Sequence, residues 1–157
     1  MIEHPSAQPP AITFRHAHSP EELVACFAVI VQLRPALDDV EEWIDRASEM
    51  ACDGYRVLAA WDGDQVVAVA GYRMMDNLIH GHFLYVDDLI TDERRRGEGL
   101  GAGLLAELSA IGRDEFCRRL VLDTAAGNIE AQRFYKREGM TDLAIGFIKP
   151  LGTGARS

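Results

Sequence analysis

Hydrophobic and polar residues change their spacing along the chain, and that spacing predicts the structural elements. Residues 12–16 alternate between apolar and polar side chains, as a half-buried strand does. Apolar residues then recur at helical spacing up to Pro35, and again from Asp38 or Asp39 to about Gly54. Ahead of the first of these segments, Ser19-Pro20-Glu21-Glu22 combines an N-cap serine, a proline in the first turn and a capping-box glutamate. The chain is therefore predicted to begin with a strand and two helices.

The middle of the chain has the pattern of a small sheet. Residues 55–61 and 65–75 have strand-like composition and flank Asp62-Gly63, a dipeptide that favours a tight turn. A third strand is predicted over residues 82–90, before the chain becomes polar at Thr91. We expect these three strands to form an antiparallel meander.

Helical spacing returns in the last third of the chain. Residues 99–116 place four leucines and an isoleucine on one stripe, which predicts a helix of about four turns. A short buried strand is predicted over residues 120–122. A further helix is expected from Asn128 to Gly139, where a left-handed glycine would end it. A last strand is predicted over residues 145–149.

Length and composition limit the domain organisation. The 157 residues fit one domain, and 48% hydrophobic residues are enough for a proper core. Three prolines in residues 1–10 predict a mobile leader, and the glycine-containing residues 151–157 predict a flexible tail. Residues 11–150 are expected to form the single domain.

Charge, cysteines and hydrophobicity exclude several classes of protein. The net charge of -9 has the wrong sign for gripping nucleic acid over a broad face. It suits a cationic or zwitterionic small substrate, or it only keeps the protein soluble. Three cysteines without a C-x-x-C pair indicate neither a disulfide framework nor a zinc ribbon. The longest apolar run is too short to span a bilayer, and no signal-peptide layout is present, so we expect a cytoplasmic protein without a membrane partner.

The segment from Leu84 to Leu105 carries the clearest chemical signal. Three consecutive arginines, Arg94–Arg96, are followed by glycines at every second position from Gly97 to Gly103. Each glycine inside a helix costs about 0.5–1 kcal/mol relative to alanine, so we expect a requirement for bare backbone here. A helix N-terminus attracts anions, and guanidinium groups fit phosphate oxygens. An anion site is therefore favoured over a flexible glycine turn with solvated arginines.

Two familiar phosphate-binding motifs fit this segment poorly. A P-loop would end in Gly-Lys-Ser/Thr, whereas this loop ends in Gly101-Ala102-Gly103-Leu104. Residues 97–102 match the dinucleotide pattern G-x-G-x-x-A, and Asp123 lies where a ribose-binding acid would be expected. However, six polar residues separate the strand from the first glycine, the strand contains Asp87-Asp88 after a meander, and too few residues follow. A Rossmann-like oxidoreductase is therefore disfavoured.

A family resemblance emerges at the same residues. Arg96-Gly97-Glu98-Gly99-Leu100-Gly101 resembles the R-x-x-G-x-G/A pyrophosphate loop of the GNAT superfamily of acyl-CoA-dependent N-acyltransferases. Asn128 to Met140 resembles that family's signature N-x-x-A-x-x-F-Y-x-x-x-G-F, with methionine replacing the final phenylalanine. The resemblance covers about residues 12–149. It implies an α+β fold, with three α/β layers and a mixed, mostly antiparallel central sheet flanked by helices, and an enzyme that uses acetyl-CoA.

The resemblance also implies which residues bind acetyl-CoA. The end of the third meander strand would pair its backbone with the pantetheine arm, as an added strand does. The loop would wrap the pyrophosphate with main-chain N–H groups, and a position at the second signature contacts the pantetheine or the attacking side. The implied residues are Leu89, Ile90 and Thr91 on the strand, Arg96, Gly97, Glu98, Gly99, Leu100, Gly101 and Ala102 in the loop, and Asn128.

Two residues are candidates for catalysis. Tyr135 matches the family position whose hydroxyl protonates the departing thiolate, and this role is favoured over that of a core aromatic, which Phe134 fills equally well. Asp87 and Asp88 are expected to point to opposite sides of their strand, so only one can face the acceptor. Asp87 resembles an acid of polyamine-type members, whereas Asp88 would anchor the meander or an arginine such as Arg73. A carboxylate is too weak a base for an ammonium group, so we expect a relay through water.

The function expected from these residues is direct acetyl transfer from acetyl-CoA to a primary amine of a small molecule or peptide in a ternary complex. A non-catalytic acyl-CoA sensor is the alternative. No metal is expected, because His80 and His82 have no third ligand spaced nearby. The acidic run 38–45 could line an entrance for polyamines or be a solvated helix face. The resemblance adds a homodimer as an expected assembly.

Overall fold

The computed structural model describes residues 11–153 and divides the chain into two compact units, Met1–Leu122 and Asp123–Ser157. The predicted leader, residues 1–10, and residues 154–157 of the predicted tail lie outside the described residues.

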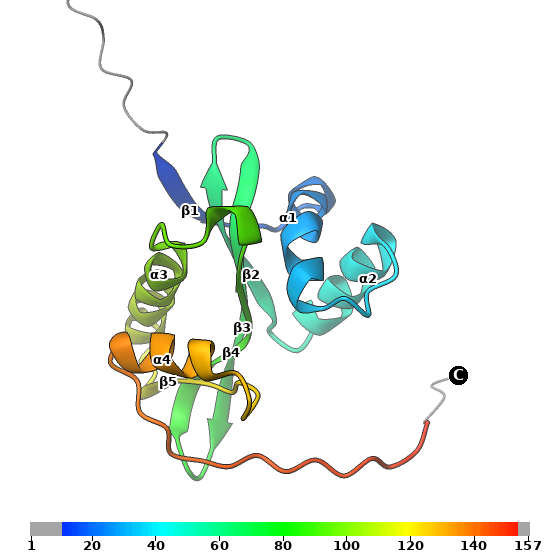
Figure 1. Cartoon of the computed structure of the whole chain (residues 1–157). Coiled ribbons are helices and arrows are strands. Elements are labelled where there is room, and N and C mark those ends of the chain that lie inside the picture. The colour runs from blue at the N-terminus through cyan, green and yellow to red at the C-terminus, as the bar shows by residue number, and fades with distance from the viewer. Residues whose placement is uncertain (1–10, 154–157) are drawn as a thin grey trace, which may run out of the picture. The chain divides into compact units, whose positions relative to one another are not determined.

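The first unit is built on one five-stranded sheet with the strand order β1-β2-β3-β4-β5 (Figure 1). Neighbouring strands from β1 to β4 are antiparallel, and β5 alone is parallel to its neighbour β4. The mixed, mostly antiparallel sheet is therefore confirmed. The strands are β1 (Ile12–His16), β2 (Arg56–Asp62), β3 (Gln65–Asn77), β4 (Gly81–Thr91) and β5 (Arg119–Leu122).

Helices cover both faces of this sheet. The helices are α1 (Pro20–Leu33), α2 (Val40–Ala51) and α3 (Leu100–Asp114). α1 contacts α2, β3 and β4, whereas α3 contacts β2 to β5, and Figure 1 shows the two groups on opposite sides of the strands. Ser19 caps α1 in a full capping box, as predicted, and Asp39, one of the two residues at which the second helix was predicted to start, caps α2.

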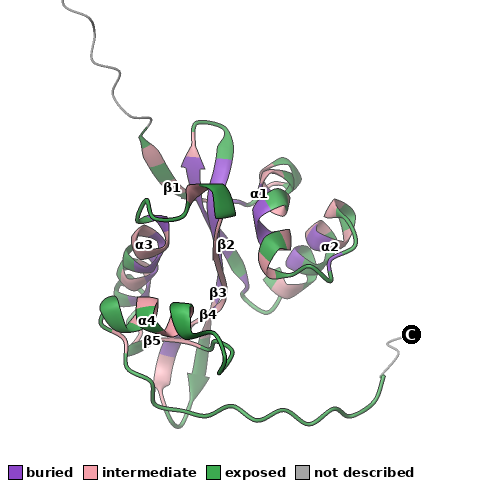
Figure 2. Cartoon of the chain, viewed as in Figure 1, coloured by how far each residue is buried: buried purple, intermediate pink, exposed green. Residues whose placement is uncertain are grey.

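The alternation of side chains along the strands separates two cores. In β2, Val57, Ala59 and Trp61 face the core formed with α1 and α2, and Leu58 and Ala60 face the core formed with α3. Figure 2 shows the buried residues concentrated in the middle strands and on the helix faces turned towards them. Because helices cover β2 and β3 on both faces, the sequences of these strands contain continuous apolar runs.

Two glycines of the first unit are explained by packing. A Cβ on Gly103 would lie 2.5 Å from the ring of Phe14, so α3 can approach β1 closely only at a residue without a side chain. A Cβ on Gly71 in β3 would overlap the Tyr55 hydroxyl and the Asp88 carboxylate. The bare backbone at Gly103 therefore serves helix packing, not the anion site for which the sequence pattern suggested it.

The second unit contains α4 (Ile129–Arg137), which has Asn128 as its N-cap and is followed by Gly139 at a φ of 85°. The predicted last strand, 145–149, is wrong: within the described part of the chain these residues pair with no neighbouring strand. The alternating apolar residues are present, but a strand also needs a hydrogen-bonded partner. Ile145, Phe147 and Ile148 are instead more than 80% exposed.

Candidate functional site

The end of β4 has one edge that β5 does not cover. β5 pairs with β4 only from Phe83 to Val86, and β4 continues to Thr91. Over this extension, Leu89, Ile90 and Thr91 remain paired with β3 on the other side. The first unit therefore leaves the outer backbone groups of these three residues available to an added chain, as the predicted pairing with a pantetheine arm requires.

A β-bulge interrupts β4 where the two candidate acids lie. Gly71 is opposite Asp88 and Tyr72 is opposite Val86, so Asp87 is the extra residue of the bulge. The prediction that Asp87 and Asp88 point to opposite faces is therefore wrong, because the bulge breaks the alternation. Both carboxylates join one polar cluster around Tyr55.

Asp88 is the anchored member of this pair. Its carboxylate accepts a hydrogen bond from the Tyr55 hydroxyl at 2.7 Å and one from the Arg34 guanidinium at 2.9 Å. Burial, followed by the nearby Asp88 carboxylate, raises the pKa of Tyr55, so its hydroxyl stays protonated as the donor. Gly71 leaves the space that this contact needs. Tyr55 and Arg34 were not predicted from sequence, because nothing local connects them to β4.

Asp87 is held by a different arginine. Its carboxylate accepts a hydrogen bond from Arg73 Nε at 3.0 Å, and the Arg73 guanidinium lies 5.4 Å from the centre of the Tyr55 ring. The sequence suggested Arg73 as a partner of Asp88, but with the bulge in β4 Arg73 pairs with Asp87 instead. Burial raises the pKa of Asp87, while the Arg73 hydrogen bond opposes this shift. Asp87 is thus a partly buried carboxylate whose basicity exceeds that of an ordinary aspartate.

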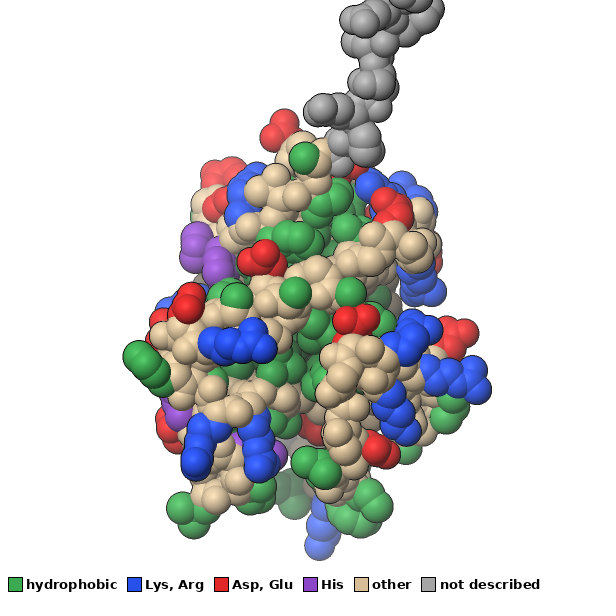
Figure 3. Space-filling view, turned by 90° about the vertical axis from the view of Figure 1, so that its left-hand side faces the viewer, with side chains coloured by type: hydrophobic (Ala, Val, Ile, Leu, Met, Phe, Trp, Pro, Cys, Tyr) green, Lys and Arg blue, Asp and Glu red, His purple; other side chains and the backbone are tan. Residues whose placement is uncertain are grey.

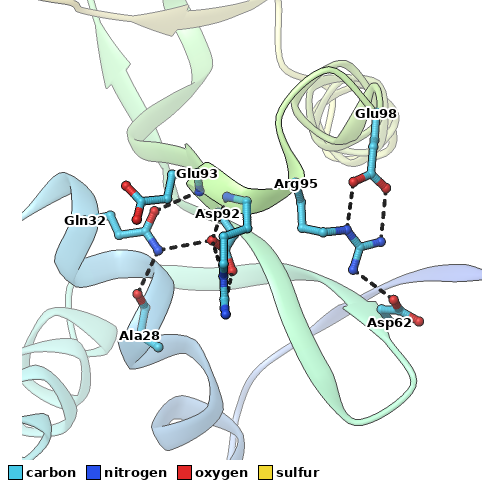
Figure 4. Close-up of polar contacts among 8 residues, drawn as sticks. Ala28, Gln32, Asp62, Asp92, Glu93, Arg95 and Glu98 are labelled. Atoms are coloured by element: carbon cyan, nitrogen blue, oxygen red, sulfur yellow. Dashed lines mark hydrogen bonds and ion pairs between the residues drawn. The ribbon is translucent and has the colours of Figure 1, made fainter.

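The loop after β4 begins at a buried carboxylate (Figure 4). Asp92 is 2% exposed and accepts hydrogen bonds from Arg94 and from Gln32 of α1. The Arg94 hydrogen bond lowers the pKa of Asp92 to about 2. Gln32 also accepts a hydrogen bond from the Glu93 backbone N–H at 3.0 Å. Neither Gln32 nor Asp92 was singled out by the sequence pattern; the only local signal was an aspartate ahead of the arginine run.

The three arginines do not form a uniform basic pocket. Arg94 pairs with Asp92, and Arg95 donates two hydrogen bonds to Glu98 and one to Asp62 (Figure 4). Among the residues that the structure describes, Arg96 alone of the three has no hydrogen bond or ion pair. On the face drawn in Figure 3, Lys and Arg side chains are likewise interspersed with acidic ones. Of the three guanidinium groups that the sequence offered to an anion, only that of Arg96 is therefore unpaired within the described residues.

Backbone geometry explains the first two loop glycines. Gly97 and Gly99 have φ angles of 83° and 78°, a left-handed conformation that favours glycine. Gly99 is the N-cap of α3 without any side-chain cap, and the Gly103 N–H is bonded to the Gly99 carbonyl. The N–H groups of the first turn, at residues 100–102, therefore have no partner within the helix. The Leu100 side chain is buried, so only its backbone can face a ligand.

The remaining predicted site residues lie in the second unit. Asn128 caps α4, because its side-chain oxygen accepts a hydrogen bond from the Ala131 N–H at 3.1 Å. Tyr135 lies on the same helix beside the ring of Phe134. Burial raises the pKa of Tyr135, which keeps its hydroxyl protonated at neutral pH. The sequence did not separate the capping role of Asn128 from a role in binding.

The two histidines near the β3–β4 turn contact different partners. His82 contacts Asp76, and His80 contacts Arg119 and Phe83. No group of three or more metal-binding side chains occurs among residues 11–153. Within the same range, no helix combines the length and the apolarity that crossing a membrane would need.

Comparison with known proteins identifies the family. Residues 18–140 match the model of the acetyltransferase (GNAT) family. An N-acetyltransferase of Bacillus subtilis, YhdJ, whose function is uncharacterized, is 26% identical over 144 residues, which cover 89% of this chain and 99% of that protein.

Solved structures share the fold at lower sequence identity. An aminoglycoside N-acetyltransferase in complex with CoA has a TM-score of 0.81 and 16% identity, over 94% of this chain and 99% of that chain. The glucosamine-6-phosphate N-acetyltransferase of Arabidopsis thaliana has a TM-score of 0.73 and 19% identity, over 90% of this chain and 99% of that chain. The family match covers most of the chain and includes both sequence motifs. The chain therefore belongs to the GNAT family of acetyltransferases, and it is an acyltransferase enzyme.

Proposed function

We propose that the protein transfers an acetyl group from acetyl-CoA directly to a primary amine of a small molecule or peptide in a ternary complex. The observation that carries this proposal is the continuous path formed by the outer edge of β4, the left-handed glycines and the N-terminus of α3. It offers backbone groups to an extended amide chain and then free N–H groups to a diphosphate, in the order in which acetyl-CoA presents them.

The residues assigned to the cofactor divide this work. Leu89, Ile90 and Thr91 would bond to the pantetheine amides through their backbone. The N–H groups of residues 97–102 would hold the diphosphate, with the unpaired Arg96 as the single charged contact. Glu98 contributes its backbone only, because its carboxylate is engaged by Arg95. Asn128 would act beside the pantetheine with the amide N–H groups that capping does not use.

Two side chains are proposed to move protons. The Tyr135 hydroxyl donates its proton to the departing thiolate, and burial keeps that proton in place at neutral pH. Asp87 orders a water that removes a proton from the amine, and its raised pKa makes it a better base than an exposed aspartate. The amine attacks the thioester carbon, the C–S bond breaks, and the thiolate leaves as the thiol.

The acceptor is proposed to be a primary amine. Two similar structures are N-acetyltransferases of aminoglycosides and of glucosamine-6-phosphate, whose acceptors carry amino groups. Asp87 and Asp88 each face an arginine in this chain, so the cluster offers little net negative charge to a polyamine. A cytoplasmic location and a homodimer remain predictions.

The proposal is tested by incubating the protein with acetyl-CoA and a library of primary amines and measuring the release of free thiol. Thiol release that depends on both substrates, with an acetylated amine found by mass spectrometry, is the expected result. Binding of acetyl-CoA without turnover for any amine would favour the acyl-CoA sensor. Initial rates at varied concentrations of both substrates should give intersecting lines, as a ternary complex requires, and parallel lines would contradict direct transfer.

Replacing Arg96 with methionine is expected to weaken the binding of coenzyme A about tenfold, because this change removes the one unpaired guanidinium of the loop. Isothermal titration with coenzyme A measures the dissociation constant. Glu98→Gln is the matched variant, for which the opposite effect on binding is expected. It removes a negative charge and the ion pair with the Arg95 guanidinium, so coenzyme A should bind more tightly. Equal dissociation constants for all three proteins would contradict a role for charge in this loop.

Replacing Asp87 with asparagine is expected to lower kcat by about 100-fold and to change its pH dependence. The base must be ionised, so the wild-type rate should fall as the pH drops through the raised pKa of Asp87. The variant should lose this acidic limb. The measurement is kcat against pH at saturating substrates, and an unchanged profile would exclude Asp87 as the base.

A further inference from the structure

We infer that the C-terminal end of α1, with its C-cap residue, is a two-point brace that fixes the end of β4 proposed to bind acetyl-CoA, with Gln32 and Arg34 as positioning residues. This inference rests on the proposed function and assigns the two residues a role in it. The two side chains hold residues on either side of Leu89–Thr91, the segment proposed to pair with the pantetheine arm.

Gln32 holds the far end of this segment, where the loop begins (Figure 4). Its side-chain oxygen accepts a hydrogen bond from the Glu93 N–H at 3.0 Å, and its nitrogen donates to Asp92 Oδ1 at 3.4 Å. The same nitrogen donates to the Ala28 carbonyl one helical turn earlier, at 3.1 Å. Gln32 is therefore fixed against its own helix and bonds both a backbone and a side-chain group of the loop.

Arg34 holds the near end, at the bulge. Its Nε donates to Asp88 Oδ1 at 2.9 Å, and its Nη2 donates to the Asp87 backbone carbonyl at 2.9 Å. Arg34 is the C-cap of α1, and its backbone N–H donates to the Ile30 carbonyl, which ties Arg34 to the end of the helix. The Arg34 guanidinium thus donates to both residues of the acidic pair, to the side chain of Asp88 and to the backbone carbonyl of Asp87.

The position of this brace has a functional consequence. Beyond Val86, β4 no longer has β5 as a neighbour, so β3 alone supports its end within the sheet. A strand with one neighbour would move more freely, and a ligand that pairs with it would lose affinity through the cost of ordering it. By fixing both ends from the C-terminal end of α1, Gln32 and Arg34 preorganise the strand between them. Gln32 should affect mainly the diphosphate end, and Arg34 mainly the reacting end.

The test compares Gln32→Leu and Arg34→Met with wild type, using coenzyme A as the ligand. Gln32→Leu is expected to raise the dissociation constant of coenzyme A and the KM for acetyl-CoA about tenfold with little change in kcat. Arg34→Met is expected to lower kcat about tenfold with a smaller change in that dissociation constant. Val24→Ala is the control, because Val24 is an exposed residue of the same helix.

The outcomes separate the brace from the proposed function. If wild type does not bind coenzyme A, the proposed function fails. If wild type binds it and Gln32→Leu binds equally well, the brace is overturned and the proposed function stands. A loss of both kcat and affinity in equal measure in both variants indicates general destabilisation and also overturns it. Should Gln32→Leu fail to fold, Gln32→Glu decides: it keeps the acceptor for the Glu93 N–H but repels Asp92, so the dissociation constant should still rise.

Discussion

Phenylalanine in place of Tyr135 is expected to lower kcat by about two to four orders of magnitude and to leave coenzyme A binding close to that of wild type. The change removes one oxygen atom and keeps the ring that lies beside Phe134. Without that hydroxyl the thiolate must leave without a proton donor, which raises the barrier of the transfer step but not the cost of binding. Steady-state kinetics and calorimetric titration with coenzyme A measure the two quantities separately.

The pH dependence gives an independent check on Tyr135. Burial raises its pKa, so the acid stays protonated until the pH exceeds the ordinary tyrosine value of about 10. The alkaline fall of kcat in wild type should begin above that value and should be absent from the residual activity of Tyr135→Phe. Tyr72→Phe is the matched control, because it removes a hydroxyl that contacts His16 instead. Full activity in Tyr135→Phe would remove this residue from the mechanism.

Alanine in place of Gly71 is expected to lower the free energy of unfolding by roughly 3 kcal/mol. The added Cβ would overlap the Tyr55 hydroxyl and the Asp88 carboxylate, so the two must separate and lose their hydrogen bond. Tyr55 belongs to the core beneath α1 and α2, where little space exists for it to move. Denaturation with urea, followed by circular dichroism, measures the change.

Gly112→Ala is the matched control for this substitution and should have the opposite sign. Gly112 lies inside α3, and a Cβ there would make ordinary contacts of 3.7 Å with Cys117 and Leu84. The change should stabilise the protein by up to about 1 kcal/mol, because alanine is the better helix former. A Gly71→Ala protein as stable as wild type would contradict this prediction, because it would mean that the Tyr55 and Asp88 side chains can accommodate the added Cβ.

Local patterns in the sequence were sufficient for most of the elements. The helix starts at Ser19 and Asp39, the turn after Asp62 and the apolar stripe of α3 are decided by residues close in the chain. The predicted strand at 145–149 is wrong because a strand, unlike a helix cap or a turn, depends on a distant part of the chain. Its alternation is local, but a strand exists only where a distant segment supplies hydrogen bonds, and alternation carries no information about that partner.

The candidate site divides in the same way. Arg96 and the left-handed Gly97 and Gly99 could be selected from their motif, since backbone conformation and anion binding depend on consecutive residues. The partners of Arg94 and Arg95 could not, because pairing depends on which carboxylates the fold brings within reach. Asp62 is an example: it lies 33 residues before Arg95 in sequence.

The sequence by itself thus determined the family, the order of the helices and strands up to α4 and the position of the glycine loop proposed to bind an anion. Only the tertiary structure decided that β4 bulges at Asp87, that Asp88 is bound by Tyr55 and Arg34, and that Gln32 supports the loop. The physical reason is that the interactions of helix caps, turns and short motifs are made between residues close together in the sequence. A bulge or an ion pair between distant residues forms instead from groups that meet only when the sheet and α1 pack together.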